Sequence, residues 1–197
     1  MVATLAAGSL VAGCAAPEML EPRSGAVPDG IDLSGDWLIR TDQREDERRL
    51  RQAISRTDGV DDRDLYRRPS GRTVDGRSTR DSGKVKGGLV YVFLETGAAL
   101  KVSQTDYGLF ISFDRAIVEE YRFGEYRMVN VGEVQAQRVT GWEEDALFVE
   151  TLGRNGMKLT ERYRLLDDGN TLERSITLRS KELEQETIVQ LFERRGP

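Results

Sequence analysis

Apolar and polar residues alternate along most of this chain with a period near two, the spacing of a strand that buries one face. From Gly88 onward, turn-forming residues interrupt the alternation about every eight to twelve residues, which is typical of antiparallel strands. The expected strands are 34–40, 89–95, 98–104, 108–113, 117–123, 126–131, 133–141, 146–154, 157–166, 171–179 and 186–194. The pattern therefore predicts an all-β fold, an antiparallel up-and-down meander that closes into a barrel.

Residues 41–86 interrupt this pattern as a highly charged insertion. Within it, residues 43–56 have the composition of one short helix, with Leu50, Ala53 and Ile54 on a single face. We expect this helix to lie across one end of the domain. Residues 57–88 are rich in Asp, Arg, Gly and Ser and predict a long charged loop.

The clearest turn signal is Asn155-Gly156, a pair suited to the positive dihedral angles of a two-residue hairpin loop. A two-residue loop would set Glu150 directly opposite Glu161 on the neighbouring strand. Like charges in opposed positions destabilise a sheet unless a cation, a proton or a ligand lies between them. The hairpin therefore marks this pair as a candidate site.

A four-residue turn at 167–170 would place Arg174 opposite Tyr163 and diagonal to Glu161. We expect Glu150, Glu161, Arg174 and Tyr163 to share one face of the sheet. They would then line a ligand pocket, as a polar anchor or an acid–base pair. Two alternatives stay open: the face is the outer, solvated one, or the charges form a closed internal ion network.

The amino-acid composition excludes several kinds of catalytic and metal-binding site. The chain of 197 residues has no histidine and one cysteine, so neither a Ser-His-Asp site nor a zinc site of nitrogen and sulfur ligands can be built. Its charges are mixed and sum to −5, which gives no field that attracts nucleic acid. We therefore expect a protein that is not an enzyme, with no metal, no cofactor and no nucleic-acid partner.

The N-terminal segment carries no charge from Val2 to Gly13 and ends in Leu10-Val11-Ala12-Gly13-Cys14. This ending resembles the lipobox of bacterial lipoproteins. The resemblance implies that residues 1–13 are a signal peptide and that Cys14 is lipidated after their removal. Ala15 and Ala16 follow in place of aspartate, which by the same resemblance implies the periplasmic face of the outer membrane.

Residues 14–30 contain several prolines and glycines and are predicted to be a flexible tether between the lipid and a domain at 31–197. At the start of that domain, Gly35-Asp36-Trp37 resembles the first motif of lipocalins. The resemblance implies a lipocalin-like barrel in which Gly35 allows a tight entry and Trp37 plugs the closed end. An arginine of the last strand, Arg194 or Arg195, would pack over the ring.

A second resemblance covers residues 141–194, which are similar to small proteobacterial envelope proteins with lipocalin-like sheets. Together the resemblances imply a lipid-anchored outer-membrane lipoprotein that binds or carries a small amphiphilic ligand in its barrel. The alternative is a structural or assembly lipoprotein whose envelope protein partner contacts the insertion at 41–86. An enzyme that uses Glu150 and Glu161 is the third hypothesis.

Overall fold

The computed structural model describes residues 18–58, 90–166, 169–180, 182 and 184–196. The predicted signal peptide, Cys14 and nearly all of the predicted loop at 57–88 lie outside the described residues.

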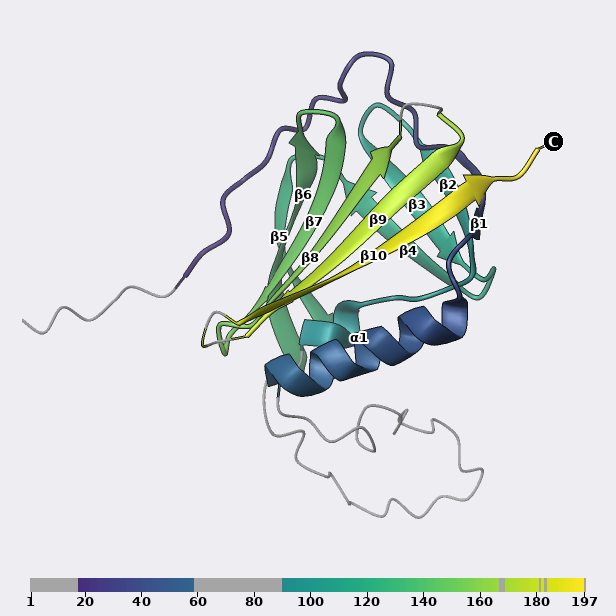
Figure 1. Cartoon of the computed structure of the whole chain (residues 1–197). Coiled ribbons are helices and arrows are strands. Elements are labelled where there is room, and N and C mark those ends of the chain that lie inside the picture. The colour runs from purple at the N-terminus through teal and green to yellow at the C-terminus, as the bar shows by residue number, and fades with distance from the viewer. Residues whose placement is uncertain (1–17, 59–89, 167–168, 181, 183, 197) are drawn as a thin grey trace, which may run out of the picture.

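Ten strands form a single antiparallel sheet that curls into a nearly closed barrel (Figure 1). The order along the sheet is β4-β3-β2-β1-β10-β9-β8-β7-β6-β5. The first and last strands, β1 and β10, pair with each other, and every other pair joins strands that are consecutive in the chain. The strands are β1 (Gly35–Ile39), β2 (Ala99–Gln104), β3 (Gly108–Phe113), β4 (Ile117–Arg122), β5 (Glu125–Val131), β6 (Val134–Glu143), β7 (Ala146–Gly153), β8 (Lys158–Leu165), β9 (Thr171–Arg179) and β10 (Gln185–Arg194). The predicted all-β meander is confirmed.

The strand predicted at 89–95 is wrong. Val90–Phe93 forms a short 3₁₀ helix, η1, and the amide of Leu94 donates to the carbonyl of Tyr91 at 2.9 Å. A short apolar run fits a buried strand and a buried helical turn equally well, so periodicity alone does not separate them.

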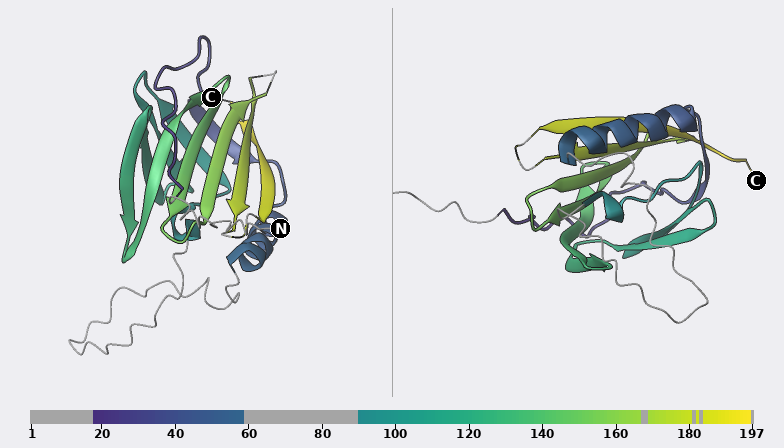
Figure 2. Two further views of the ribbon diagram at one scale, coloured as in Figure 1. Left: turned by 90° about the vertical axis from the view of Figure 1, so that its left-hand side faces the viewer. Right: turned by 90° about the horizontal axis from the view of Figure 1, so that it is seen from below.

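The predicted helix is present as α1 (Gln43–Asp58). Asp42 caps it, because its carboxylate accepts from the amides of Arg44 and Glu45 at 2.9 and 3.2 Å. The expected face of Leu50, Ala53 and Ile54 packs against apolar residues of β8, β9 and β10. Figures 1 and 2 show α1 across the lower end of the barrel, beside η1, as predicted. We call this the helix end.

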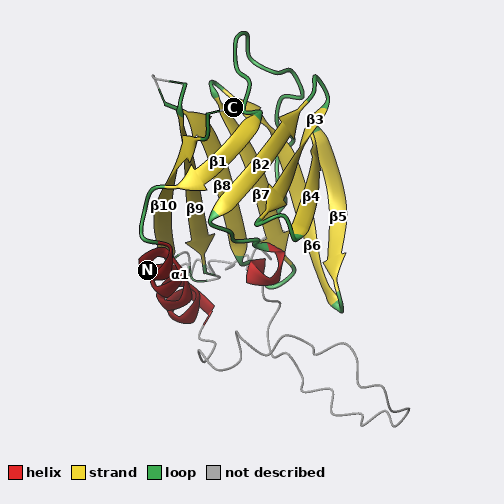
Figure 3. Cartoon of the chain, turned by 90° about the vertical axis from the view of Figure 1, so that its right-hand side faces the viewer, coloured by secondary structure: helices red, strands yellow, loops and turns green. Residues whose placement is uncertain are grey.

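The opposite end, which we call the Trp37 end, is closed as the lipocalin resemblance implies. Trp37 is 1% exposed, and its ring lies 4.2 Å from the guanidinium carbon of Arg194, its partner on β10. Arg194, and not Arg195, is therefore the arginine that covers the ring. Gly35 has a φ of +151°, which other residues rarely adopt, and a side chain there would begin 2.6 Å from the Nη1 atom of Arg194, so glycine is favoured at this position. Figure 3 shows β1 and β2 beside this end.

Residues 18–24 form a segment that we call the N-terminal strap. They run along the outer face of β6 and β7 (Figure 2, left). Leu20 is buried against Val139 and Leu152, and the carbonyl of Ser24 accepts from the amide of Trp142 at 2.8 Å. This part of the predicted tether is therefore packed against the barrel wall.

Candidate functional site

The hairpin of β7 and β8 differs from its predicted register by one residue. Gly153 and Met157 close a three-residue loop through a 2.8 Å hydrogen bond, and only Gly156 in the loop has a positive φ, +83°. This is a three-residue hairpin with glycine at the left-handed position, not a two-residue turn centred on Asn155-Gly156. Glu150 consequently pairs with Thr160, and Glu161 pairs with Val149.

A shift of one residue sends the two glutamates to opposite faces of the sheet. Glu161 points into the barrel and Glu150 lies on the outer wall beneath the N-terminal strap. The prediction that they share one face is wrong, and with it the acid–base pair that they were to form. The predicted pairing of Arg174 with Tyr163 is confirmed.

Inside the barrel, Glu161, Arg174 and Tyr163 form a closed ion network. One carboxylate oxygen of Glu161 accepts from Arg174 Nε at 3.1 Å and from the Tyr163 hydroxyl at 2.8 Å. Arg174 also donates to the carbonyl of Glu95 at 2.7 Å and to Gln190 at 3.4 Å. The side chains of Arg174 and Glu161 are 0% and 2% exposed, so the pair is enclosed by protein.

Large side chains fill the barrel around this network. Those that are almost completely buried include Trp37, Tyr121, Phe113 and Phe192. Burial raises the pKa of both Tyr121 and Tyr163 well above the usual value for a phenol, because the ionised form would lose its hydration. Both hydroxyls therefore stay protonated at neutral pH and serve the packing of the interior.

On the outer wall, Glu150 holds the strap. Its carboxylate accepts from Arg23 Nε at 2.9 Å and pairs with Lys158 on β8, while the Arg23 guanidinium lies 4.1 Å from the Phe148 ring centre. Burial alone would raise the pKa of Glu150, but the bonds from Arg23 and Lys158 outweigh it and hold the pKa below the usual glutamate value.

The depressed pKa of Glu150 makes the strap sensitive to acid. We expect its ion pairs to act fully above the unfolded-state pKa of about 4.3 and to weaken as the pH falls below it, where the carboxylate takes up a proton. Hydrogen exchange of residues 18–24, corrected for intrinsic rates, should therefore show protection at pH 6 that is reduced at pH 3. Glu150→Gln should expose the strap at both values. Equal protection at both pH values in the unmodified protein would contradict this role.

The sheet is open on one side, between β4 and β5. Along the described ranges, no strand pairs with the outer edges of these two strands, although they follow one another in the chain. A pocket of about 300 Å³ lies at this lateral opening, towards the helix end. It is lined by Val92 and Phe93 of η1, Glu95, Glu119 of β4, residues 127–131 of β5, and Arg138 of β6.

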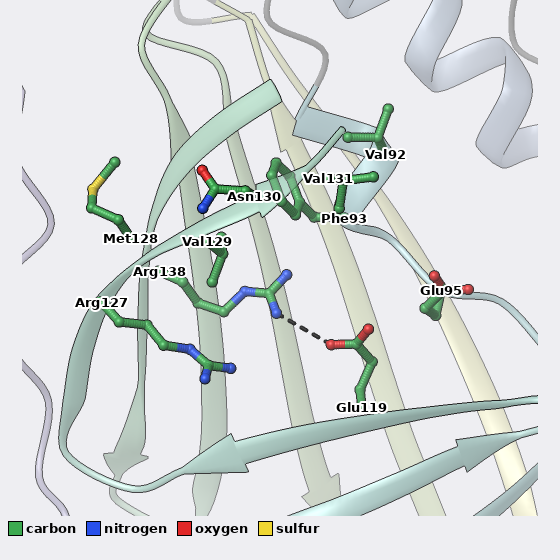
Figure 4. A pocket seen from close by; sticks show the side chains of 10 residues that line it. All are labelled: Val92, Phe93, Glu95, Glu119, Arg127, Met128, Val129, Asn130, Val131 and Arg138. Carbon is green, nitrogen blue, oxygen red and sulfur yellow. Dashed lines mark hydrogen bonds and ion pairs between the residues drawn. The ribbon is translucent and has the colours of Figure 1, made fainter. Parts of the chain in front are cut away.

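Two arginines of the pocket point from β5 and β6 towards β4 (Figure 4). Arg138 is buried; it donates to Glu119 at 3.3 Å and to the Thr151 hydroxyl at 3.2 Å. Its guanidinium lies 5.5 Å from the ring centre of Phe93. Arg127 is more exposed and donates to the carbonyl of Glu120 at 3.1 Å. The pocket thus combines two guanidinium groups with an apolar wall.

Sequence reasoning missed this pocket. Arg138 lies at an inward-facing position of β6, between Ala136 and Thr140, but alternation marks its face only when the register is known. Phe93 lies in the segment that was predicted to be a strand. No pattern in the sequence signals that β4 and β5 separate.

The described ranges bring together no group of three acidic or cysteine side chains that could hold a metal ion. They also contain no helix of the length and apolar character that crossing a bilayer requires.

Comparisons with known proteins give a likeness of fold. No family model matches the chain, and no curated protein matches it. Among solved structures, it is similar to fatty-acid-binding protein 1 of Echinococcus granulosus, with 12% identity and a TM-score of 0.46 over 83% of this chain and 98% of that one. It is also similar to the REP1-NXSQ fatty acid transporter, with 10% identity and a TM-score of 0.46 over 84% and 98%. The fluorescent protein UnaG matches with 14% identity and a TM-score of 0.46 over 83% and 97%. Likeness at this level describes the course of the backbone, and we rest no functional conclusion on it.

Proposed function

We propose that this protein is a lipid-anchored envelope protein that binds a small amphiphilic ligand at the lateral opening between β4 and β5. The observation that carries the proposal is the pocket itself, where unpaired strand edges leave a space of about 300 Å³ beside two arginines and an apolar wall. This volume is at the lower limit of small-molecule sites in proteins. A ligand of modest size fits it.

Because buried side chains fill the interior of the barrel, we place the ligand outside that interior. Arg174 and Glu161 satisfy one another at the centre of the barrel and are enclosed, so they are not open to a ligand. The opening instead offers the more exposed Arg127 to an anionic head group, beside Arg138, whose charge Glu119 already pairs. Val92, Phe93 and Val129 offer an apolar wall to the tail. The ligand therefore lies in the wall of the barrel.

The lipid anchor is proposed from the sequence around Cys14, which resembles a lipobox. Two or three acyl chains make a stable anchor where one does not. The absence of aspartate after Cys14 supports retention in the outer membrane, with the barrel on the periplasmic side. In this role the protein takes no part in a chemical reaction; it holds or carries its ligand.

Binding of decanoate, a small carboxylate with one apolar chain, tests the site and is measured by isothermal titration calorimetry. Arg127→Gln and Arg138→Gln should each weaken binding about tenfold or more, which corresponds to about 1.4 kcal/mol. Arg122→Gln is the matched control, because Arg122 is exposed on β4 and pairs only with Glu120 among the described residues. The proposed site would be overturned if the unmodified protein and the three variants bound the carboxylate with equal affinity. It would also be overturned if the uncharged methyl ester bound as tightly as the carboxylate.

A structural or assembly lipoprotein is the second candidate, and the filled interior favours it. Exposed apolar side chains also lie on β5, on β4 and on the adjacent β3, namely Phe110, Val118, Tyr126 and Met128. Such a surface is suited to an envelope protein partner. Native mass spectrometry of detergent-extracted protein separates the two candidates, because a bound small molecule supports carriage and a bound protein supports assembly.

A further inference from the structure

The N-terminal strap sets the distance between the barrel and its anchor. If residues 14–30 were a free tether, they would reach at most ~60 Å, since an extended chain spans about 3.5 Å per residue. Only Ala15, Ala16 and Pro17 separate Cys14 from the first residue of the strap. With the strap in place, Cys14 lies within about 14 Å of Glu18.

The strap is a specific part of the fold. A side chain at position 141 of β6 would begin 2.5 Å from the carbonyl oxygen of Ser24 and 2.7 Å from the Cβ atom of Arg23, so the strap lies directly on Gly141. The amide of Leu20 donates to the side chain of Gln137 at 3.3 Å. Arg23 of the strap pairs with the buried Glu150 and also with Glu143 on the barrel wall.

The strap also has a direction. Ser24 pairs with Trp142, near the end of β6 that lies at the Trp37 end. Glu18 pairs with Arg179 at 2.5 Å, and Arg179 is the last residue of β9, at the helix end. The chain that precedes Glu18 therefore leaves the barrel at the helix end.

We propose that the barrel stands on the membrane with its helix end against the bilayer surface. This inference rests on the proposed lipidation of Cys14. A link of about 14 Å holds the helix end at the lipid head groups, and the side chain of Met19, 65% exposed, lies beside the link. The ligand pocket, lined by η1 and by the last residues of β5, is at the same end. It therefore opens sideways close to the bilayer surface, where a membrane amphiphile reaches it without crossing the periplasm.

The single cysteine of the chain makes the orientation measurable. Lipidation consumes the thiol of Cys14, so a second cysteine is the only site for a thiol-reactive fluorophore. Arg154→Cys places it at the helix end and Asp145→Cys at the Trp37 end. The eight-residue strand β7 separates the two positions by about 26 Å. In vesicles with nitroxide-labelled head groups, we expect quenching at position 154 to be at least twice that at position 145. Equal quenching, or stronger quenching at position 145, overturns the orientation.

Release of the strap should abolish the difference. Leu20→Asp removes the apolar contact of the strap without altering a barrel residue, and Gly141→Val blocks its path from the side of the wall. Both should lower quenching at position 154 towards the value at 145, with circular dichroism confirming that the barrel is folded. Glu21→Gln, an exposed change on the strap, is the control and should leave quenching unchanged. If quenching at position 154 still exceeds that at position 145 after the strap is released, the strap does not set the orientation.

Failure of the anchor is distinguished from failure of the orientation. Flotation with vesicles and the mass of the N-terminal peptide report lipidation independently of quenching. A protein that does not float and keeps a free Cys14 thiol overturns both proposals. A protein that floats and is quenched equally at both positions keeps its anchor and overturns only the orientation.

Discussion

Glu161→Gln is expected to lower the free energy of unfolding by about 3–5 kcal/mol, the usual cost of leaving one member of a buried ion pair without its partner. Arg174 is fully buried, and Glu161 neutralises its charge. The neutral amide would leave a guanidinium without compensation in a medium of low polarity. Urea unfolding followed by circular dichroism measures the loss.

Two further variants make this expectation specific. Glu173→Gln removes a carboxylate of the neighbouring strand that pairs with Arg162 and Arg164 on the outer face, and it should cost about 1 kcal/mol or less. The double change Glu161→Leu with Arg174→Met removes both charges and should cost less than Glu161→Gln alone. A Glu161→Gln protein as stable as the Glu173→Gln protein would show that the network does not hold a charged arginine.

Trp37→Ala is expected to cost a similar amount, about 3–5 kcal/mol, because it removes a large and almost completely buried side chain and leaves a cavity at the Trp37 end. The change also removes the indole ring on which the guanidinium of Arg194 lies. The indole nitrogen donates to the carbonyl of Leu33 at 3.0 Å, so the entry to β1 loses a bond as well.

The neighbouring residue supplies the control for this change. Leu38 lies on the same strand with its side chain 37% exposed, and Leu38→Ala should cost less than about 1 kcal/mol. Chemical denaturation of the two variants side by side gives the comparison. If Trp37→Ala were no more destabilising than Leu38→Ala, the ring would not be the plug of this end.

The fold could be predicted largely because each element carries its own signal. Alternation identified the ten strands, and the apolar face of Leu50, Ala53 and Ile54 identified the helix and its position across an end of the barrel, without saying which end. The lipocalin motif at Gly35 and Trp37 correctly implied an arginine over the ring. Alternation alone did not choose between Arg194 and Arg195; the pairing of β1 with β10 does.

The candidate site was harder to predict because it depends on register. Asn155-Gly156 marks a turn correctly, but the loop is closed by Gly153 and Met157, one residue longer than a type I′ turn. That single residue moved Glu150 from the interior to the outer wall. Glu150 is therefore not the partner of Glu161 that was predicted, and it binds Arg23 of the strap instead.

The lateral opening exists because β4 and β5 separate, and no local pattern in the sequence indicates this separation. Phe123 and Gly124 join β4 to β5, yet the amide of Phe123 donates to Tyr107 in the turn between β2 and β3, and that of Gly124 donates to Thr140 of β6. The two strands are thus drawn apart at their shared turn. Arg138 becomes part of a pocket only because this separation exists.

The pairing of β1 with β10 has a consequence for how the chain reaches its final form. Arg194 donates to the carbonyl of Ser34, a residue 160 positions earlier in the sequence. The entropy needed to close a loop grows with its length, and contacts distant in sequence slow folding. Strands β2 to β4 and strands β5 to β10 pair through short hairpins, and β1 pairs with β2, whereas the pairing of β1 with β10 must wait until β10 has formed. Assembly of the wall is thus completed by the first and last strands together, after the whole chain has been made.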